Sequence, residues 1–121
     1  MRRLVIMGAL VALLVALFAV PALALNFQCT RYNCYGTNRP DNILERAGNG
    51  VADHIQALRG ADTIKANLYG NDIDKIYGNR GNDTLYANDG DSLDRVVGGP
   101  GFDHCYVDPG DVTVGCEVVR Y

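Results

Sequence analysis

A motif of nine residues that recurs along the chain is the feature that most restricts its fold. Each copy holds an aspartate followed two positions later by an aliphatic residue or a cysteine. The marker aspartates are Asp41, Asp53, Asp62, Asp74, Asp83, Asp94 and Asp103. They are separated by 12, 9, 12, 9, 11 and 9 residues. A period this short predicts a solenoid of small stacked units, in which each unit packs only against its neighbours.

The composition of each copy indicates a metal-binding turn followed by a short strand. The copies are GTNRPDNIL, GNGVADHIQ, ALRGADTIK, YGNDIDKIY, GNRGNDTLY, DGDSLDRVV and GGPGFDHCY. Glycines at the first, second and fourth places allow positive φ angles, so the backbone can bend its carbonyl groups toward one point. The aspartate at the sixth place adds a carboxylate, and calcium takes about six to eight such oxygen ligands. The aliphatic residue that follows should point inward, and its polar neighbours outward.

This pattern resembles the hemolysin-type (RTX) calcium-binding repeat family over residues 36–106. The copy GGPGFDHCY fits the family pattern G-G-x-G-x-D-x-U-x at every fixed place, with Cys105 as the apolar residue U. The resemblance implies an all-β fold, a parallel β-roll or β-helix solenoid in which two copies form one coil. It also implies that calcium ions are stacked between the turns of adjacent coils.

If two copies close one coil, odd-numbered and even-numbered copies stack on opposite edges of the roll. The odd-numbered copies keep more of the glycines and are expected to form the metal edge. Its predicted calcium ligands are Asp41, Asp62, Asp83 and Asp103, in turns that contain Gly60, Gly81, Gly99 and Gly101. Four stacked turns leave three gaps, so three calcium ions are expected. Residues 37–40 depart from the motif, and the outermost site is the least secure of the three.

The even-numbered copies predict a looser edge. Each follows an insertion (residues 45–47, 66–68 and 87–88), and its fourth place holds Val51, Asp72 or Ser92 instead of glycine. Ile73 and Leu93, beside the aspartates, are expected to act as apolar plugs. The weaker ligand candidates on this edge are Asp53, Asp74, Asp89, Asp91 and Asp94. The last three of these fit another calcium ion and a solvated loop equally well.

The first 24 residues have the features of a secretory signal peptide. Arg2 and Arg3 precede a long apolar run, and a small-residue A-L-A sequence ends at Ala24. A membrane anchor is the alternative, but Pro21 and the A-x-A end favour cleavage after Ala24. Without residues 1–24, nine Lys and Arg residues stand against 14 Asp and Glu residues, a net charge of −5. We therefore expect a secreted chain that binds no nucleic acid and does not stay in the membrane after cleavage.

Four cysteines in an exported chain predict two disulfides. Of the three possible pairings, Cys29 with Cys34 and Cys105 with Cys116 requires the least ordering of the chain. A zinc site is the rival interpretation. It is disfavoured because the spacings are C-x4-C and C-x10-C, without the C-x2-C pair typical of zinc, and only the two histidines could complete it.

The segments that flank the repeats are expected to protect the ends of the solenoid, since open strand edges invite association. Residues 25–35 are predicted to form a short N-terminal loop cap tied by the first disulfide. Residues 107–121 are predicted to form a C-terminal cap, with 112–119 as a returning strand that the second disulfide holds under the last coil.

Catalytic groups are sparse in this sequence. Ser92 is the single serine, and His54 and His104 have no nucleophile at a telling distance; a glycosidase-like carboxylate pair is the remaining enzymatic alternative. The expected function is a non-enzymatic module that binds calcium and folds with it, because seven inward side chains make a thin core. An extracellular adhesion or surface-binding solenoid with purely structural aspartates is the alternative. The mixed character of the outward residues favours the calcium module.

Overall fold

The computed structural model describes residues 24–121, and the predicted signal peptide lies, apart from Ala24, outside the described residues. Residues 24–121 form short β-strands only, and they contain no helix that could span a membrane. The strands are β1 (Leu25–Gln28), β2 (Asn33–Tyr35), β3 (Asp41–Leu44), β4 (His54–Gln56), β5 (Thr63–Lys65), β6 (Lys75–Tyr77), β7 (Thr84–Tyr86), β8 (Arg95–Val97), β9 (His104–Tyr106), β10 (Val112–Val114) and β11 (Val118–Arg120).

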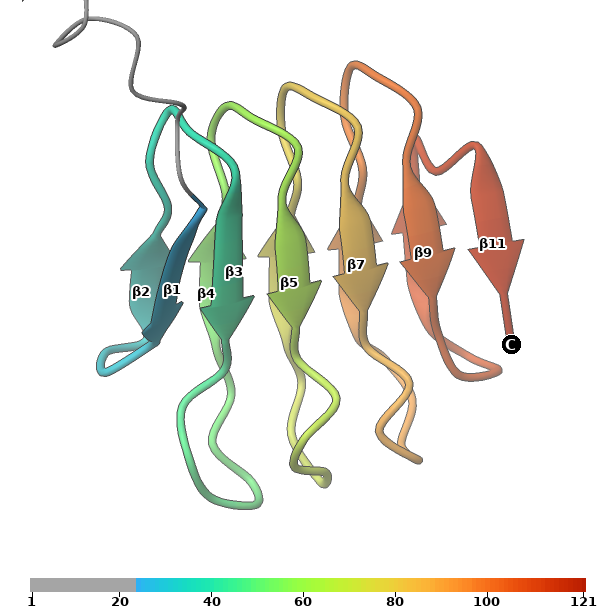
Figure 1. Cartoon of the computed structure of the whole chain (residues 1–121). Coiled ribbons are helices and arrows are strands. Elements are labelled where there is room, and N and C mark those ends of the chain that lie inside the picture. The colour runs from blue at the N-terminus through green and yellow to red at the C-terminus, as the bar shows by residue number, and fades with distance from the viewer. Residues whose placement is uncertain (1–23) are drawn as a thin grey trace, which may run out of the picture.

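These strands form two parallel sheets that lie one behind the other (Figure 1). The odd-strand sheet has the order β1-β3-β5-β7-β9-β11, and the even-strand sheet has the order β10-β8-β6-β4-β2. Each strand from β1 to β9 pairs with the strand two places later in the chain. Asn42 of β3 pairs with Thr63 of β5, which pairs with Thr84 of β7. One coil therefore advances 21 residues here, and the predicted all-β parallel solenoid is confirmed.

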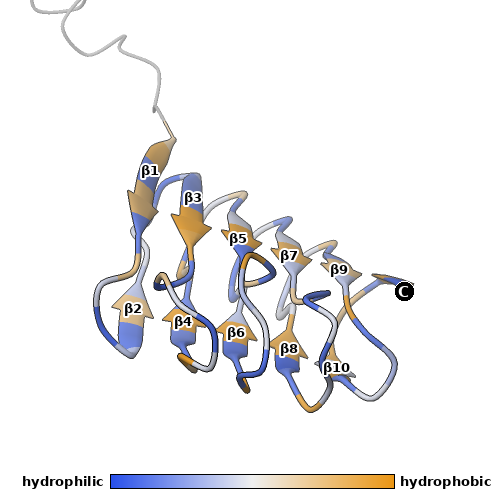
Figure 2. Ribbon diagram, turned by 90° about the horizontal axis from the view of Figure 1, so that it is seen from below, coloured by the Kyte–Doolittle hydropathy of each residue, from blue (hydrophilic) through white to orange (hydrophobic). Residues whose placement is uncertain are grey.

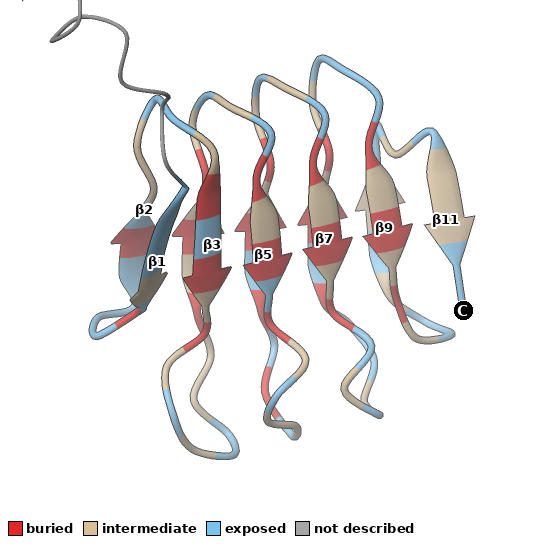
Figure 3. Cartoon of the chain, in the orientation of Figure 1, coloured by how far each residue is buried: buried red, intermediate tan, exposed pale blue. Residues whose placement is uncertain are grey.

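The core is a double row of apolar side chains from the middle of the strands, seen as orange and red bands in Figures 2 and 3. The motif residues in these rows are Ile43, Ile64, Leu85 and Cys105 in the odd-strand sheet and Ile55, Ile76 and Val96 in the even-strand sheet. All of them are fully buried, as the motif predicts. Strand alternation explains why, since Thr63 and Lys65 on either side of Ile64 face away from the core.

Two kinds of turn join the sheets and form the two edges of the roll. The short turns are residues 36–40, 57–62, 78–83 and 98–103, and they lie along the top in Figure 1. The long turns are residues 45–53, 66–74 and 87–94, and they lie along the bottom together with the shorter turn 107–111. We call these the short-turn edge and the long-turn edge. They correspond to the odd-numbered and even-numbered copies of the motif.

The prediction of apolar plugs on the long-turn edge is wrong. Ile73 and Leu93 keep 49% and 62% of their surface exposed. Side chains alternate in direction along an extended segment, and the inward positions on either side of Ile73 go to Asp72 and Asp74, which are buried. The core on this edge is closed instead by the first residue of each turn along it. These residues are Glu45, Ala66, Ala87 and Val107, all fully buried.

The ends of the roll are further coils, which differs from the predicted loop and single returning strand. At the N-terminal end, β1 and β2 pair with β3 and β4. At the C-terminal end, β10 and β11 lie in different sheets and pair with β8 and β9. Gly115, with a φ of 65°, lies in the turn between β10 and β11. Backbone pairing alone continues the coil, so the end segments need no copy of the motif.

Both disulfides form as predicted. Cys29 is bonded to Cys34 and Cys105 to Cys116, and no cysteine in the described part of the chain is free. Cys105 is fully buried in the core row and pairs in register with Val119 of β11. The second disulfide therefore fastens the last coil across the end of the core.

Candidate metal centre

The motif aspartates of the short-turn edge form a ladder of hydrogen bonds between coils. The Oδ1 atoms of Asp62, Asp83 and Asp103 accept the backbone N–H of the aspartate one coil earlier, at 2.8, 2.9 and 2.8 Å. Glu117 extends the ladder, since its Oε2 accepts the N–H of Asp103 at 2.7 Å. The structure thus brings the four predicted ligands, from Asp41 to Asp103, into one row, and all four are buried.

The long-turn edge contains a second ladder of the same kind. The Oδ1 atoms of Asp74, Asp94 and Asp111 accept the backbone N–H groups of Asp53, Asp74 and Asp94, at 2.7, 2.8 and 3.1 Å. Asp53, Asp74 and Asp94 are fully buried. The aspartates of the two edges therefore form the same pattern of hydrogen bonds, although the long-turn edge has fewer of the motif glycines.

The other carboxylate oxygen of each interior ladder aspartate is buried and has no hydrogen-bond partner among residues 24–121. We call such an oxygen unpartnered. The unpartnered Oδ2 atoms of the ladders belong to Asp62, Asp83, Asp103, Asp74 and Asp94. Buried polar atoms in native proteins are normally hydrogen-bonded, so a row of exceptions calls for an explanation. A bound cation is one such explanation.

The coil of β3 and β4 differs, because protein groups donate hydrogen bonds to the carboxylates of its aspartates. Asp41 Oδ2 accepts the backbone N–H of Thr37 at 2.6 Å. Asp53 Oδ2 accepts the backbone N–H of Arg46 at 2.7 Å, and Asp53 Oδ1 forms an ion pair with the Arg46 guanidinium. The need for a cation is therefore concentrated in the interior coils.

Backbone carbonyl oxygens lie close to the unpartnered oxygens of the short-turn edge. A Cβ atom added to Gly78 would overlap Asp83 Oδ2 and lie 2.8 Å from the Gly98 carbonyl oxygen. A Cβ atom added to Gly98 would lie 2.5 Å from Asp103 Oδ2 and overlap the Gly115 carbonyl oxygen. A carboxylate oxygen and a carbonyl oxygen from the next coil thus border the same small space. This donor set suits a hard cation such as calcium.

In one short turn, the equivalent position carries a methyl group. Ala57 holds the first place of the turn 57–62, where the other three short turns have glycine, and its backbone N–H is bonded in the same way as theirs. The Ala57 side chain is fully buried. The space beside Asp62 is therefore narrower than the space beside Asp83 or Asp103.

The other predicted glycines of this edge permit the close stacking of the turns. Gly60, Gly81, Gly99 and Gly101 have φ values of 128°, 132°, 98° and 133°, which side chains disfavour. A Cβ at Gly81 would overlap the carbonyl group of Gly60, and one at Gly101 would overlap that of Gly81. Only glycine allows adjacent turns to approach this closely.

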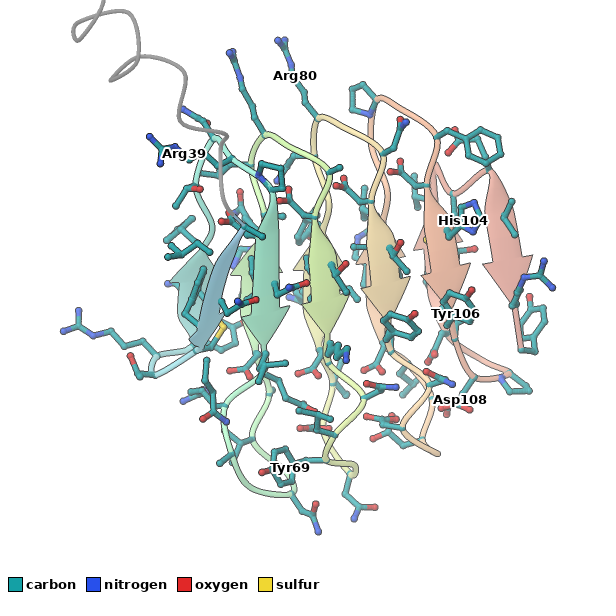
Figure 4. The ribbon with its side chains drawn as sticks, viewed as in Figure 1. Arg39, Tyr69, Arg80, His104, Tyr106 and Asp108 are labelled. Carbon is teal, nitrogen blue, oxygen red and sulfur yellow. A yellow bond between two sulfur atoms is a disulfide. The ribbon has the colours of Figure 1, made fainter. Side chains whose placement is uncertain are left out.

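The long-turn edge, which carries Tyr69 and Asp108 in Figure 4, gathers carboxylates into groups. Three groups have carboxylate oxygens within 4.8 Å of one another. They are Glu45 with Asp53 and Asp74, Asp72 with Asp74 and Asp89, and Asp89 with Asp91 and Asp94. The three aspartates of the third group were predicted as possible ligands from the sequence, whereas Glu45 and Asp72 were not. The sequence did contain a signal for both residues. Asp72 stands where the motif has glycine, and Glu45 follows its copy of the motif at the place where Ala66 and Ala87 follow later copies.

Burial raises the pKa values of these carboxyl groups, and neighbouring carboxylates raise them further. The pKa rises to about 8 for Asp74, to about 7 for Glu45, Asp62 and Asp94, and to about 6 for Asp83 and Asp89. The backbone N–H donors of the ladders lower the pKa, but by less than burial raises it. In the absence of a cation, the folded chain therefore disfavours the charged form of these groups.

The fold and the site together define a class of protein: a parallel β-roll whose stacked turns present rows of buried carboxylates and carbonyl oxygens. A family model, the RTX calcium-binding nonapeptide repeat, matches residues 47–68 and 69–105. Residues 47–105 are therefore built from repeats of the RTX calcium-binding type, as the motif predicts. Searches of curated proteins and of solved structures gave no significant match. The candidate ligand atoms on both edges are all oxygens, which suits calcium, the ion that the family model names.

Proposed function

We propose that this protein is a secreted, non-enzymatic, calcium-binding β-roll whose folding depends on calcium. The observation that carries the proposal is the buried, unpartnered Oδ2 atom of each interior ladder aspartate. Burying a carboxylate without a counter-charge costs several kcal/mol, roughly, and in a metal-free chain the group is driven toward its neutral form. Bound calcium supplies the positive charge and accepts the carboxylate and carbonyl oxygens as ligands.

On the short-turn edge, we assign the ligand role chiefly to Asp83 and Asp103. Their Oδ2 atoms are unpartnered, and they border a space that only glycine leaves open. Asp62 should contribute a weaker site because of the methyl group of Ala57. Asp41 should be the weakest of the four ligands, because Thr37 already bonds its carboxylate. The count of three ions on this edge stays a prediction.

The arrangement of the ladders couples ion binding to the stacking of coils. Each Oδ1 atom holds its carboxylate against the preceding coil, while the carbonyl oxygen beside Oδ2 comes from the following coil. Carboxylates repeated at the strand spacing of about 4.8 Å repel one another when charged. Ligands from successive coils come together only in the folded chain, so the free energy of ion binding adds to the free energy of folding.

Other features support export and a non-catalytic role. Two disulfides suit an oxidising compartment outside the cytoplasm, which agrees with the predicted signal peptide. Both histidines have a structural environment. His54 contacts Asn33 at 3.1 Å, and the His104 ring packs against Phe102 with 5.5 Å between the ring centroids.

Calorimetric titration of the purified protein with calcium chloride tests this proposal. We expect several ions to bind, with dissociation constants of about 10⁻⁴–10⁻³ M, as in other extracellular calcium modules. Magnesium should bind much more weakly, because it requires a tighter octahedral geometry and gives up its waters reluctantly. If calcium releases no heat and leaves the melting temperature unchanged, the proposal is wrong. The adhesive solenoid would then be the better interpretation of the aspartate rows.

A further inference from the structure

Two carboxylates on the long-turn edge stand outside the place that the RTX motif gives to its aspartate. Asp72 occupies the fourth place of its copy, where the motif has glycine, and Asp89 occupies the first place of the next even-numbered copy. Asp74, the motif aspartate between them in the sequence, lies close to both. One carboxylate oxygen from each of the three residues lies within 4.8 Å of the other two. The sequence pattern alone gives no reason for this meeting.

The oxygens that meet are buried and lack hydrogen-bond donors. Asp72 is 6% exposed and Asp74 is 0% exposed. Within residues 24–121, both carboxylate oxygens of Asp72 and the Oδ2 atoms of Asp74 and Asp89 have no hydrogen-bond partner. One oxygen of each of these three carboxylates lies within 4.8 Å of an oxygen of the other two, and no donor of the described chain bonds to the four unpartnered atoms. Acceptor atoms pair with donors or with cations. A water molecule can donate only two hydrogen bonds, whereas a calcium ion takes about six to eight oxygen ligands.

The remaining contacts fix these residues in place. Asp74 Oδ1 accepts the N–H of Asp53 at 2.7 Å, and Asp89 Oδ1 accepts the N–H of Asp91 at 3.1 Å. The backbone N–H of Asp72 donates to Asp91 Oδ2 at 2.9 Å. The hydrogen bonds of the turn thus leave the other oxygens of the group free.

No basic side chain balances this group within the described part of the chain. The single salt bridge there joins Arg46 to Asp53, one coil earlier. Three ionised carboxylates at this distance repel one another strongly in a buried site. A cation of charge two or more would remove most of that repulsion.

We propose that Asp72, Asp74 and Asp89 bind a divalent cation of the calcium type through their side chains on the long-turn edge. The donors are all oxygen, which suits calcium better than zinc or copper. This inference rests on the proposed calcium-dependent folding and extends it. The short-turn sites offer one carboxylate per coil plus backbone carbonyls, whereas this site offers three carboxylates. Because affinity rises with ligand charge, this site is the first to fill in a calcium titration.

Asp72→Asn tests the site, because asparagine keeps the shape of the side chain and removes its charge. In calorimetric titrations with calcium chloride, the wild-type protein should show a tight first phase. In Asp72→Asn, that phase should be lost or weakened by about tenfold or more. In a chelator, Asp72→Asn should melt at or above the wild-type temperature, because a buried unpaired charge is gone. That second result separates loss of binding from loss of folding.

Asp83→Asn on the short-turn edge is the matched control, since it removes one buried ladder charge far from this group. It should weaken later phases and keep the tight first phase. A tight phase that survives in Asp72→Asn would overturn this site and leave the proposed function standing. A wild-type protein that binds no calcium would overturn both. Should Asp72→Asn not fold, Asp89→Asn must show the same loss for the site to stand.

Discussion

The two oxygens of an interior ladder aspartate have different surroundings. In Asp83, Oδ1 accepts the N–H of Asp62 from the preceding coil, and this bond belongs to the fold whether or not an ion is present. Oδ2 is buried beside the backbone of Gly78 and has no donor in the described structure. The first oxygen therefore stabilises the coil, while the second destabilises it until a proton or a cation arrives.

Asp83→Asn should separate these two roles. The asparagine carbonyl oxygen can still accept the Asp62 N–H, and the amide replaces the unpartnered oxygen. We expect the metal-free protein to gain about 1–2 kcal/mol of stability and the calcium affinity of its site to fall by about tenfold. Thermal melting in chelator and calcium titration measure both effects.

Asp53→Asn is the matched control for that change. The Asp53 carboxylate already pairs with Arg46, so its loss should lower metal-free stability by about 1–3 kcal/mol and leave calcium affinity nearly unchanged. Equal losses of calcium affinity in the two variants would contradict the assignment of unpartnered oxygens as ligands.

Two further substitutions change the first residue of a short turn. One removes a methyl group and the other adds one. Ala57→Gly should open the space beside Asp62 and strengthen calcium binding there, at a cost of about 1 kcal/mol in metal-free stability. Gly78→Ala should have the opposite effect on calcium, because the new methyl would overlap Asp83 Oδ2. Calcium titrations of both proteins measure this exchange. Unchanged binding in both would show that the ions do not occupy these spaces.

The sequence correctly predicted the burial of those side chains whose direction follows from the two-residue period of a β-strand. The inward residues such as Ile64, and the aspartates that precede the strands, followed from alternation and the nine-residue motif. Glu45 and Asp72 were missed, and Ile73 was placed inward wrongly, because they lie in long turns. The alternation of side chains continues from Asp74 back to Ile73 and Asp72, but only the three-dimensional path of the turn shows that the chain is extended there.

At the scale of elements, strands of three or four residues are stable only because each has neighbours. The interior strands pair on both sides, whereas β1, β2, β10 and β11 pair on one side only. Each end of the roll carries a disulfide, which compensates for the missing neighbour. The ends were predicted as a loop at residues 25–35 and a single strand at 112–119, not as full coils, because GCE at residues 115–117 and the sequence before Gly36 lack the motif that marked the others.

Replacing both Cys105 and Cys116 by serine should lower the unfolding free energy by about 3 kcal/mol, from the entropy of the closed loop. Replacing Cys29 and Cys34 opens a loop with a sequence separation of 5 instead of 11, so the expected loss is smaller, about 2 kcal/mol. Denaturant unfolding in the presence of calcium compares the two variants. A larger loss of unfolding free energy in the variant without Cys29 and Cys34 would contradict this prediction, because the shorter loop should contribute less.

At the scale of the whole molecule, two rows of carboxylates run the length of an otherwise thin apolar core. Most of this charge is buried, and the pKa values of the groups in both rows are raised. The solenoid architecture as a whole was predictable, since the repeat dictates the coil. The distribution of cation sites between the edges was not, since it depends on which oxygens remain unpartnered.

The stability of the metal-free protein should fall as pH rises from about 5 to about 8. The folded pKa is about 8 for Asp74 and about 7 for Asp62, above the unfolded value near 4. A carboxyl group with a raised folded pKa stabilises the fold below its unfolded pKa, and this contribution is lost as pH passes the folded pKa. Melting temperatures in chelator across this range measure the trend.

Calcium should reverse that trend, because calcium and protons compete for the same oxygens. In saturating calcium the melting temperature should stay level or rise from pH 5 to pH 8, roughly, as deprotonation favours binding. A metal-free protein that becomes more stable with rising pH would show that the buried carboxylates are satisfied by groups other than a cation.

The central claim is that the ion and the fold are coupled, and far-ultraviolet circular dichroism of the purified protein tests it most directly. Spectra and melting curves are recorded in chelator and then in about 2 mM calcium, where each site with a dissociation constant of about 10⁻⁴–10⁻³ M adds about 0.7–1.8 kcal/mol of stability. We predict a largely disordered or early-melting chain in chelator and a β-rich spectrum with a clearly higher melting temperature in calcium. Identical β-rich spectra and identical melting temperatures in both conditions would contradict the account.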